Sequence, residues 1–295
     1  MLLAKLILQA GLLAAAMCAA GVGLAVAAGL NAPSSGQIAF ISGRDGDYEI
    51  YLMDVEANLT AQLTNNEVDD IYPAWSPDGC CLAYSSRRGG HSAIYTMNLL
   101  TGATQQLTNL ENVAVTKPHW SPEGDRLVME ITPGEQARTE TCFLTLASAD
   151  FDCVADGFGA SWSPDGTSVA SYVQETTGQF AVRLISLEDY FDTRLVQNVG
   201  GHVGVRPAWS PDGSQIAYSC NDDICVMNAD GSAARTLIDG SGSELNADWS
   251  PDGKVLVFDS RSRGNVELFL YDVEFMTIRR LTYSDGADGT PVWRP

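Results

Sequence analysis

Basic residues are scarce in this chain of 295 residues. Lysine and arginine together number 17, against 37 aspartate and glutamate residues, and no basic run is longer than the pairs Arg87-Arg88 and Arg279-Arg280. Proteins that bind nucleic acid need a local excess of lysine and arginine to neutralise phosphates. The composition therefore argues against nucleic acid as a partner.

Sequence motifs of several enzyme classes are also missing. The chain has no Gly-x-Ser-x-Gly nucleophile elbow, no His-Glu-x-x-His helix, no phosphate loop and no dinucleotide fingerprint. It has no Cys-x-x-Cys pair, so a zinc ribbon or a thioredoxin-like protein is unsupported. A non-catalytic protein is favoured. A propeller lyase or hydrolase that uses paired carboxylates stays open, because such pairs leave no reliable sequence trace.

A long apolar run occupies the N-terminus. Between Leu6 and Leu30 the one clearly polar side chain is Gln9, and the single cation Lys5 precedes the run. Residues 1–30 are therefore expected to be a signal peptide, cleaved after Ala25-Val26-Ala27, or a retained apolar helix that anchors the chain. Residues 31–36 form a short linker, and in both cases the remainder is exported and extracytoplasmic. Membrane contact is expected through residues 6–30 alone, if they are retained.

Six cysteines remain in the exported part, and an even count in an oxidising compartment permits disulfide bonds. Cys142 and Cys153 flank one expected hairpin, and Cys220 and Cys225 flank another, so each pair is a candidate disulfide. Cys80-Cys81 is either a vicinal bridge or two thiols.

One pentapeptide recurs along residues 37–295. Trp-Ser-Pro-Asp-Gly begins at Trp75, Trp162, Trp209 and Trp249, Glu123 replaces its aspartate in the copy at Trp120, and a shortened copy stands at Trp293. The tryptophans are 45, 42, 47, 40 and 44 residues apart. This is the period of a four-stranded propeller blade, and each repeat contains four short β-rich segments bounded by Gly, Asp, Asn and Pro.

The ends of the repeat array predict a closed ring. Three expected strands at residues 37–64 lack an inner partner, and an inner strand at about residues 290–293 lacks the other three. Pairing them completes a sixth blade and removes two exposed sheet edges. The fold class is therefore all-β: a six-bladed propeller with four antiparallel strands per blade. The Pro-Asp-Gly residues suit tight turns, and the tryptophans suit packing between blades.

The repeat resembles a known family at several positions. Ile38-Ala39-Phe40, Arg44-Asp45-Gly46, Glu49-Ile50-Tyr51, Leu63-Thr64 and the stretch from Pro73 to Gly79 look like the WD40-like (PD40) repeat of TolB-type six-bladed propellers. The resemblance covers essentially all of residues 36–295. It implies an exported propeller that binds a partner protein or ligand on one face.

The two rims of such a ring differ. One, the turn rim, collects the Pro-Asp-Gly turns and the turns between third and outer strands, which are short and repeated. The other, the loop rim, collects the second-to-third and outer-to-inner loops, which differ from blade to blade and are the expected binding surface. The first loop set contains Arg44, Arg87, Arg88, His91, Arg138, Arg261 and Arg263. The second contains Asp69, Asp70, Tyr72, His202, Arg206, Glu244, Asp285 and Asp288.

Several of these residues have a second interpretation. Arg44 and Arg261 could pair with carboxylates of their own blades. His119 and Asp248 precede tryptophans where small or apolar residues predominate, and a hydrogen-bonded role between blades is expected for both. No cofactor is expected. Asp45-Gly46-Asp47 and residues 285–289 offer oxygen ligands, but neither follows the spacing of a complete calcium loop. Calcium in the tunnel or in these loops is the alternative that stays open.

The sequence thus predicts an exported, non-catalytic binding or scaffold module of the cell envelope. Its expected partner is an envelope protein or peptide, bound through the loop rim. Arginine is the expected anchor residue of that surface.

Overall fold

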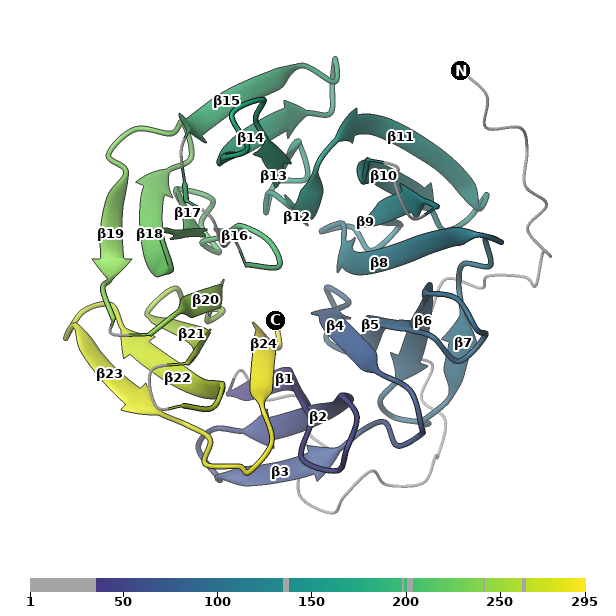
Figure 1. Cartoon of the computed structure of the whole chain (residues 1–295), viewed down its shortest axis with the longest axis vertical. Coiled ribbons are helices and arrows are strands. Elements are labelled where there is room, and N and C mark those ends of the chain that lie inside the picture. The colour runs from purple at the N-terminus through teal and green to yellow at the C-terminus, as the bar shows by residue number, and fades with distance from the viewer. Residues whose placement is uncertain (1–35, 135–137, 198, 201–203, 241, 262–263) are drawn as a thin grey trace.

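The computed structural model describes residues 36–295, except 135–137, 198, 201–203, 241 and 262–263. These residues form six antiparallel four-stranded sheets arranged around a central axis (Figure 1). The all-β, six-bladed propeller predicted from the repeat is confirmed. The described residues contain no helix that could cross a bilayer. The expected apolar helix within residues 1–30 lies outside the described part.

Each sheet contains one strand of each radial position. The inner strands are β4 (Asp70–Trp75), β8 (Val113–Trp120), β12 (Phe158–Trp162), β16 (Ala208–Trp209), β20 (Glu244–Trp249) and β24 (Asp288–Trp293). The second strands are β5 (Cys81–Ser86), β9 (Arg126–Pro133), β13 (Ser168–Gln174), β17 (Gln215–Cys220), β21 (Val255–Ser260) and β1 (Gln37–Ser42). The third strands are β6 (Ala93–Asn98), β10 (Glu140–Thr145), β14 (Phe180–Ser186), β18 (Asp223–Asn228), β22 (Glu267–Asp272) and β2 (Glu49–Asp54). The outer strands are β7 (Thr104–Gln106), β11 (Asp150–Asp156), β15 (Asp192–Gln197), β19 (Arg235–Ile238), β23 (Thr277–Arg280) and β3 (Leu59–Gln62).

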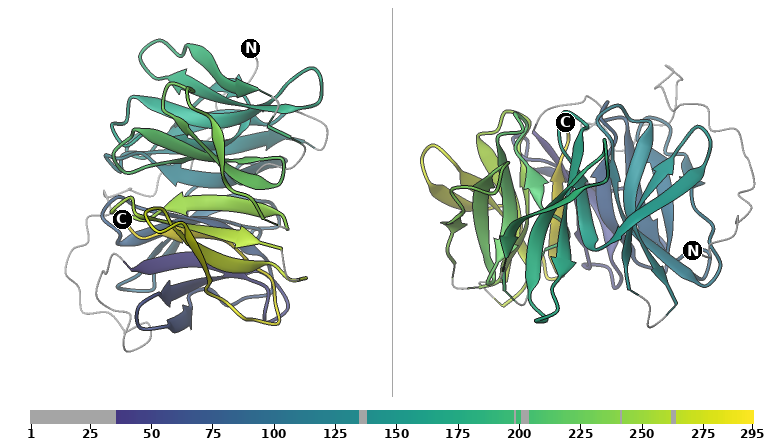
Figure 2. Two further views of the ribbon diagram at one scale, coloured as in Figure 1. Left: turned by 90° about the vertical axis from the view of Figure 1, so that its left-hand side faces the viewer. Right: turned by 90° about the horizontal axis from the view of Figure 1, so that it is seen from above.

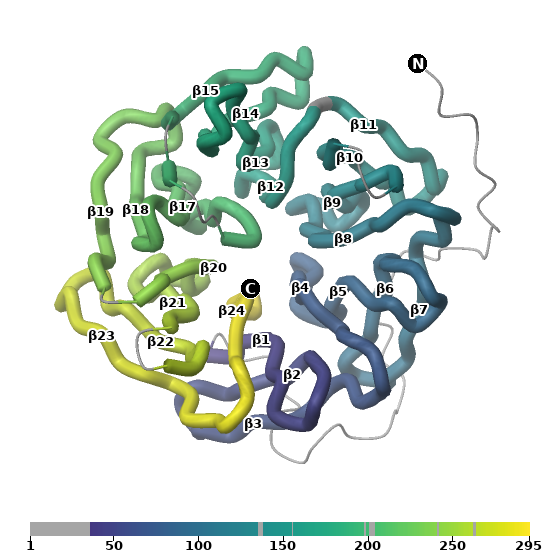
Figure 3. Tube along the Cα trace, viewed as in Figure 1, coloured from purple at the N-terminus to yellow at the C-terminus, as the bar shows by residue number. Residues whose placement is uncertain are grey.

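The ring closes as the sequence predicts. β24 pairs with β1, with Trp293 opposite Ile38 and Asp288 opposite Ser42, and the sheet continues through β2 to β3. Figure 3 shows β24 and β1 side by side, although they come from opposite ends of the described chain. Closure leaves every second and third strand with a neighbour on both sides.

The hydrophobic core is divided among the six interfaces between blades. Each repeat tryptophan packs with apolar residues of the preceding blade: Trp75, for example, lies with Ala39, Ile50 and Val292. The Trp75 indole also donates a hydrogen bond of 3.2 Å to the Val292 carbonyl. The tryptophans therefore hold neighbouring blades together, as expected from their spacing.

The Ser-Pro-Asp-Gly segments form tight turns by a repeated set of bonds. In the copy at Ser163 the amide of Gly166 donates to the Ser163 carbonyl at 2.9 Å, and the Ser163 hydroxyl donates to the Asp165 carboxylate at 2.6 Å. The glycine has φ of +70°, a left-handed conformation that glycine adopts at little cost. In the copy with Glu123, the serine hydroxyl binds Asp125 instead, at 2.9 Å.

The outer strands begin and end earlier than the Leu-Thr segments suggest. β3, β7 and β23 end before Leu63, Leu107 and Leu281. The threonine that follows each leucine accepts a hydrogen bond from a third strand: Thr64 Oγ1 accepts from the Ile50 amide at 2.8 Å. At this position a threonine side chain takes the place of a backbone hydrogen bond between the two strands. The alternation of apolar and polar residues does not indicate such a replacement.

Both candidate disulfides form. Cys142 and Cys153 are opposite each other on β10 and β11, and Cys220 and Cys225 join β17 to β18. Cys80 and Cys81 belong to neither disulfide and carry thiols. The choice between a vicinal bridge and two thiols is therefore resolved in favour of thiols.

Candidate functional site

The strands run between the two rims of the disc, which Figure 2 shows edge-on. On the turn rim, the turn after each third strand is bonded to the residue that follows the Asp-Gly turn, as in Leu99 N to Cys80 O at 3.0 Å. The equivalent bond in the closing blade runs from Val55 N to Gly36 O at 2.9 Å. Gly36 therefore lies on the turn rim, and the loops expected to bind a partner lie on the opposite rim.

Two of the predicted anchor arginines are held by carboxylates of their own blades. Arg44 pairs with the buried Asp288 at 3.2 Å, and its guanidinium lies 4.5 Å from the ring centre of Tyr51. Arg88 pairs in the same way with the buried Asp70 and lies over Tyr84. The local pairing that the sequence left open for Arg44 is thus present, and it ties the second-to-third loop to the inner strand.

The other predicted residues are distributed around the loop rim. Arg87, Arg138, Arg261, Asp69 and Asp285 are exposed, and His91 is half-buried. Arg138 pairs with Asp156 at 2.7 Å, and Arg87 donates to Ser92 at 3.2 Å. Glu244 is buried and accepts a hydrogen bond of 2.9 Å from Ser260. His202 and Arg263 lie outside the described residues.

A β-bulge interrupts the inner strands near the loop rim. The pairing register shifts between Ile71 and Ala74, between Thr116 and His119, and between Leu245 and Asp248. In each bulge the residue three positions before the tryptophan has positive φ: Tyr72 (58°), Lys117 (51°), Asn246 (55°) and, in β24, Thr290 (47°). Such conformations cost about 1–3 kcal/mol each for residues other than glycine and cluster at functional sites.

These bulge residues border a cavity at the mouth of the central tunnel on the loop rim. The cavity has a volume of about 420 Å³. Its lining combines the four bulge residues with Tyr48, Asp69, Gly204 and Val205. Bulges re-aim side chains, and here side chains from four separate blades converge on one opening. We call this opening the loop-rim mouth.

The charges at the loop-rim mouth are paired or hydrogen-bonded to their neighbours. The Lys117 ammonium lies 3.0 Å from Glu130 and about 5.5 Å from the rings of Tyr72 and Phe158. Below the bulges, Asp259 accepts hydrogen bonds from the Asn246 side chain at 2.7 Å and the Thr290 amide at 2.8 Å. Burial raises the pKa of Asp259 to about 6, although both hydrogen bonds oppose that rise. Asp259 therefore supports two of the four bulge residues.

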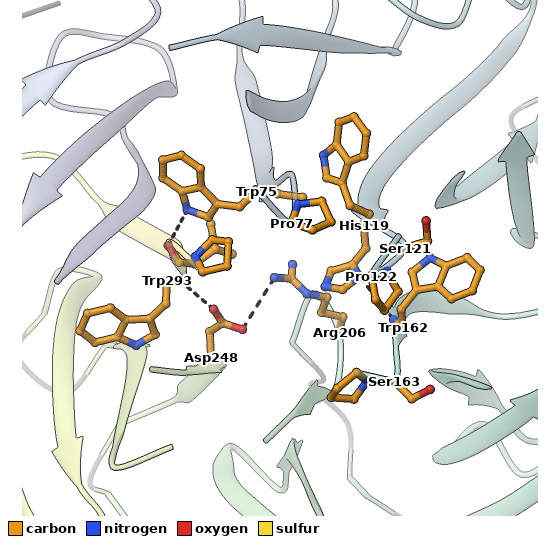
Figure 4. Close-up of a pocket in the computed structure, with 15 residues that line it drawn as sticks. Trp75, Pro77, His119, Ser121, Pro122, Trp162, Ser163, Arg206, Asp248 and Trp293 are labelled. Carbon is orange, nitrogen blue, oxygen red and sulfur yellow. Dashed lines mark hydrogen bonds and ion pairs between the residues drawn. The ribbon is translucent and has the colours of Figure 1, made fainter. Parts of the chain in front are cut away.

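Arg206 belongs to the same repeat position, and its side chain points towards Asp248 (Figure 4). Its guanidinium lies 4.0 Å from Asp248. Burial raises the pKa of the Asp248 carboxyl to about 6. Desolvation and the nearby Arg206 charge hold the pKa of His119 well below its usual range. A second cavity of about 230 Å³ surrounds these three side chains and opens towards the turn rim.

His119 and Asp248 also join neighbouring blades. The Trp162 amide donates to His119 Nδ1 at 3.3 Å, and the Trp293 amide donates to Asp248 at 2.8 Å. In each case the donor belongs to the next inner strand around the ring. The hydrogen-bonded role between blades that was predicted for both residues is confirmed.

The chemistry of the loop-rim mouth is that of recognition. Among the described residues that line it, Asp69 is the single carboxylate. Three of the other acids predicted for this rim, Asp70, Glu244 and Asp288, are buried and bonded within their blades. The fourth, Asp285, is exposed and does not line the mouth. Within the described part of the chain, one group offers three atoms arranged for a metal ion, Glu140 with Cys142 and Cys153, and the disulfide occupies both of its sulfurs.

Sequence reasoning found Tyr72 but missed Tyr48, Lys117, Asn246 and Thr290. A signal for the bulge position was present: three residues before each tryptophan the repeats read Tyr72, Lys117, Gly159, Arg206, Asn246 and Thr290, while the tryptophan itself never changes. A position that differs in every copy of a repeat is free of the packing demands that fix its neighbours. Comparison of the six repeats position by position would therefore have selected the residues three positions before each tryptophan.

Comparisons with known proteins agree with the fold. The family described as TolB beta propeller domain (PD40) matches residues 18–160 and 153–295. An uncharacterised protein of Agrobacterium fabrum is 26% identical over 189 residues, which are 59% of this chain and 60% of that protein. A TolB homolog of Chlorobium luteolum is 30% identical over 114 residues, which are 38% of this chain and 25% of the homolog. The matches thus span at most about 60% of these curated relatives.

Solved structures with this fold include TolB proteins and a lyase. TolB from Acinetobacter baumannii superposes with a TM-score of 0.75 at 20% identity, covering 89% of this chain and 68% of that one. An oligogalacturonate lyase in complex with manganese superposes with a TM-score of 0.54 at 19% identity, covering 83% and 73%. Identities this low show the fold alone. Because the family match extends over both halves of the repeat array, the chain belongs to the TolB β-propeller (PD40) family.

Proposed function

We propose that this protein is an exported, non-catalytic propeller that binds a protein or peptide of the cell envelope at its loop-rim mouth. The observation that carries the proposal is the convergence of Tyr72, Lys117, Asn246 and Thr290 on one cavity, each in a left-handed conformation. Stored backbone strain of this kind persists where side-chain direction matters more than stability.

The composition of the loop-rim mouth suits a peptide. Tyr48 and Tyr72 supply flat, partly apolar surface, Lys117 supplies one cation, and Asn246 and Thr290 supply groups that can donate and accept hydrogen bonds. A volume of about 420 Å³ accommodates a few side chains of a bound segment rather than a whole domain. The partner would then present a short exposed segment to the tunnel.

Export is supported by two features of the chain. Residues 6–30 are almost wholly apolar, and both disulfides join adjacent strands in the folded domain. Disulfides persist in oxidising compartments and are rare in the reducing cytosol. The extracytoplasmic side of a bacterial membrane satisfies both, and the TolB name carried by its relatives favours the same compartment.

A propeller lyase or hydrolase is the alternative, and a glycoside hydrolase would require two acids that face each other across the substrate. The lyase fold is similar, but Asp69 is the single acid among the described residues lining the mouth. Binding is therefore the function that the geometry supports better.

The test is a comparison of two glycine substitutions. Tyr72→Gly removes a tyrosine from the mouth and relieves its positive φ, so the variant is expected to fold at least as stably as the parent. Asn58→Gly makes the matched change at φ of 52° in an exposed turn on the opposite rim. After crosslinking and pull-down from native envelopes, partners captured by the parent should be retained by Asn58→Gly and lost with Tyr72→Gly. Retention of every partner by Tyr72→Gly would refute binding at this mouth.

A further inference from the structure

The turn rim is less uniform than its repeated turns suggest. Its third-to-outer turns expose large apolar side chains in three blades: Leu100 after β6, Tyr190 and Phe191 after β14, and Phe275 and Met276 after β22. Phe191 is 65% exposed, Phe275 72% and Met276 75%. We call these residues the apolar tips. Tyr190 and Phe191 are consecutive in the chain, as are Phe275 and Met276, so two of the three turns expose an apolar pair. Exposed apolar groups that cluster mark contact sites for proteins or membranes, whereas single ones need no explanation.

The apolar tips lie on alternate blades. Those blades are β4–β7, β12–β15 and β20–β23, and Figure 1 shows them evenly spaced around the ring. The tips of the three intervening turns carry small or polar residues such as Ala149, Asp230 and Asn58. Leu59, 48% exposed, follows Asn58 as the first residue of β3. Three points on one rim define a plane parallel to the disc. A flat occupant can contact all three together, whereas a peptide at the tunnel could reach none of them.

The chain enters the propeller on this same rim. Gly36 is bonded to Val55 in the turn between β2 and β3, and β1 then runs from the turn rim to the loop rim. Residues 31–36, between the apolar run and β1, can span at most about 20 Å when fully extended. A bilayer that holds residues 6–30 is therefore kept near the turn rim, while the loop rim is separated from it by the length of the strands.

We propose that the turn rim rests on a lipid bilayer, with the apolar tips seated among the headgroups. Phenylalanine, tyrosine, methionine and leucine at loop ends are side chains that partition into this interface. This arrangement points the loop-rim mouth away from the membrane, towards a partner in the compartment. It extends the membrane contact that was expected of residues 6–30 alone.

The charge of the rim selects the lipid. The Asp-Gly turns are nearer the axis on the same rim, and hydrogen bonds from Ser163, Ser210 and Ser250 hold the pKa values of their aspartates below the usual range. These carboxylates are ionised at neutral pH and repel anionic headgroups. The turn rim is therefore expected to bind zwitterionic bilayers. We expect it to bind less tightly to bilayers rich in the anionic lipid phosphatidylglycerol.

Brominated lipid provides the test, because bromine in the acyl chains quenches tryptophan within contact distance. The full chain, with residues 1–30, is reconstituted into brominated phosphatidylcholine vesicles as the parent and as Phe275→Trp, Phe191→Trp and Tyr283→Trp. Tyr283 is 74% exposed on the loop rim and is the matched control for Phe275. The native tryptophans all lie in inner strands, so parent emission is subtracted as a baseline.

The expected result is loss of most of the added emission for Phe275→Trp and Phe191→Trp, with none lost for Tyr283→Trp. Phosphatidylglycerol should reduce the loss at low salt, and added salt should restore it. Equal quenching at Tyr283, or none at Phe275, would overturn the proposal. So would quenching at Phe275 without Phe191, because the disc would then touch the bilayer at one edge. Unquenched tips in a chain that dimerises in detergent would assign the rim to a second copy.

Discussion

Single residues in unusual backbone conformations set the direction of the groups at the loop-rim mouth. Tyr72, Lys117 and Thr290 each precede a proline, which ordinarily favours extended backbone, yet all three are left-handed. The surrounding sheet holds them there, since the strand pairing resumes on either side of each bulge. Residues of this kind are where local sequence preference and the fold disagree.

Asp259 allows a pH test at this scale. Its folded pKa of about 6 lies above the usual 3.8, so its contribution to stability is fully present below pH 3.8 and is lost as the pH rises through 6. We expect Asp259→Asn to gain stability relative to the parent by up to about 3 kcal/mol between pH 4 and pH 7.5. The new amide also changes the free energy of unfolding, by an amount that does not depend on pH.

Urea unfolding of both proteins across that range measures the difference. Asp285→Asn, at an exposed position of the same rim, serves as the control for the loss of one carboxylate charge. Parallel curves for the parent and Asp259→Asn would show that Asp259 does not titrate differently in the folded state.

The loops of the propeller are fastened to its strands by buried ion pairs. Arg88 joins the β5–β6 loop to Asp70 at the start of β4, and Arg44 joins the β1–β2 loop to Asp288 at the start of β24. Both carboxylates are fully buried. Removal of one member of such a pair leaves an uncompensated buried charge, which costs more than the pair itself contributes.

We therefore expect Arg88→Ala to lower the free energy of unfolding by about 3 kcal/mol. Its neighbour Arg87, exposed and bonded to Ser92, should change stability by less than about 0.5 kcal/mol when replaced by alanine. Denaturant unfolding of the two variants compares them directly. Equal losses would mean that the Arg88 pair is no stronger than an ordinary surface contact. Tests of partner binding at this rim should use Arg87 rather than Arg88 for the same reason.

Elements with repeated chemistry were the ones that the sequence could predict. The Trp-Ser-Pro-Asp-Gly period predicted the blades, the unpaired segments at residues 37–64 and 290–293 predicted closure, and hairpin symmetry predicted both disulfides. The bulges, the Leu-Thr bonds and the pairing of Arg88 were not predicted. Each depends on contacts between different strands or loops of one blade, such as Ile50 with Thr64 and Arg88 with Asp70, for which the pattern within a single strand carries no information.

At the scale of the whole molecule, stability depends on a ring of six interfaces. The core clusters each combine residues of two neighbouring blades. A blade therefore buries its apolar faces only when both neighbours are present. The inner strand β24 contacts both β20 and β4, so it belongs to two of these interfaces as well as to its own sheet.

Truncation before Asp288 tests this dependence. We expect the shortened chain to expose the edge of β1 and the apolar faces beside it, to lose its single cooperative melting transition and to aggregate. Calorimetry and light scattering measure the two effects. A truncated chain that stays monomeric and melts in one sharp step would show that five blades and a three-stranded remnant suffice.

Pairing of β24 with β1 also sets a time order for folding during synthesis. Ribosomes make β1 first, and β24 follows all the other described strands, so the first blade must wait for its inner strand until the rest of the propeller has been made. A chain that crosses a membrane N-terminus first would arrive with the seam between β1 and β24 still unpaired. The seam would close only after β24 had emerged, so translocation and folding of the ring need not compete.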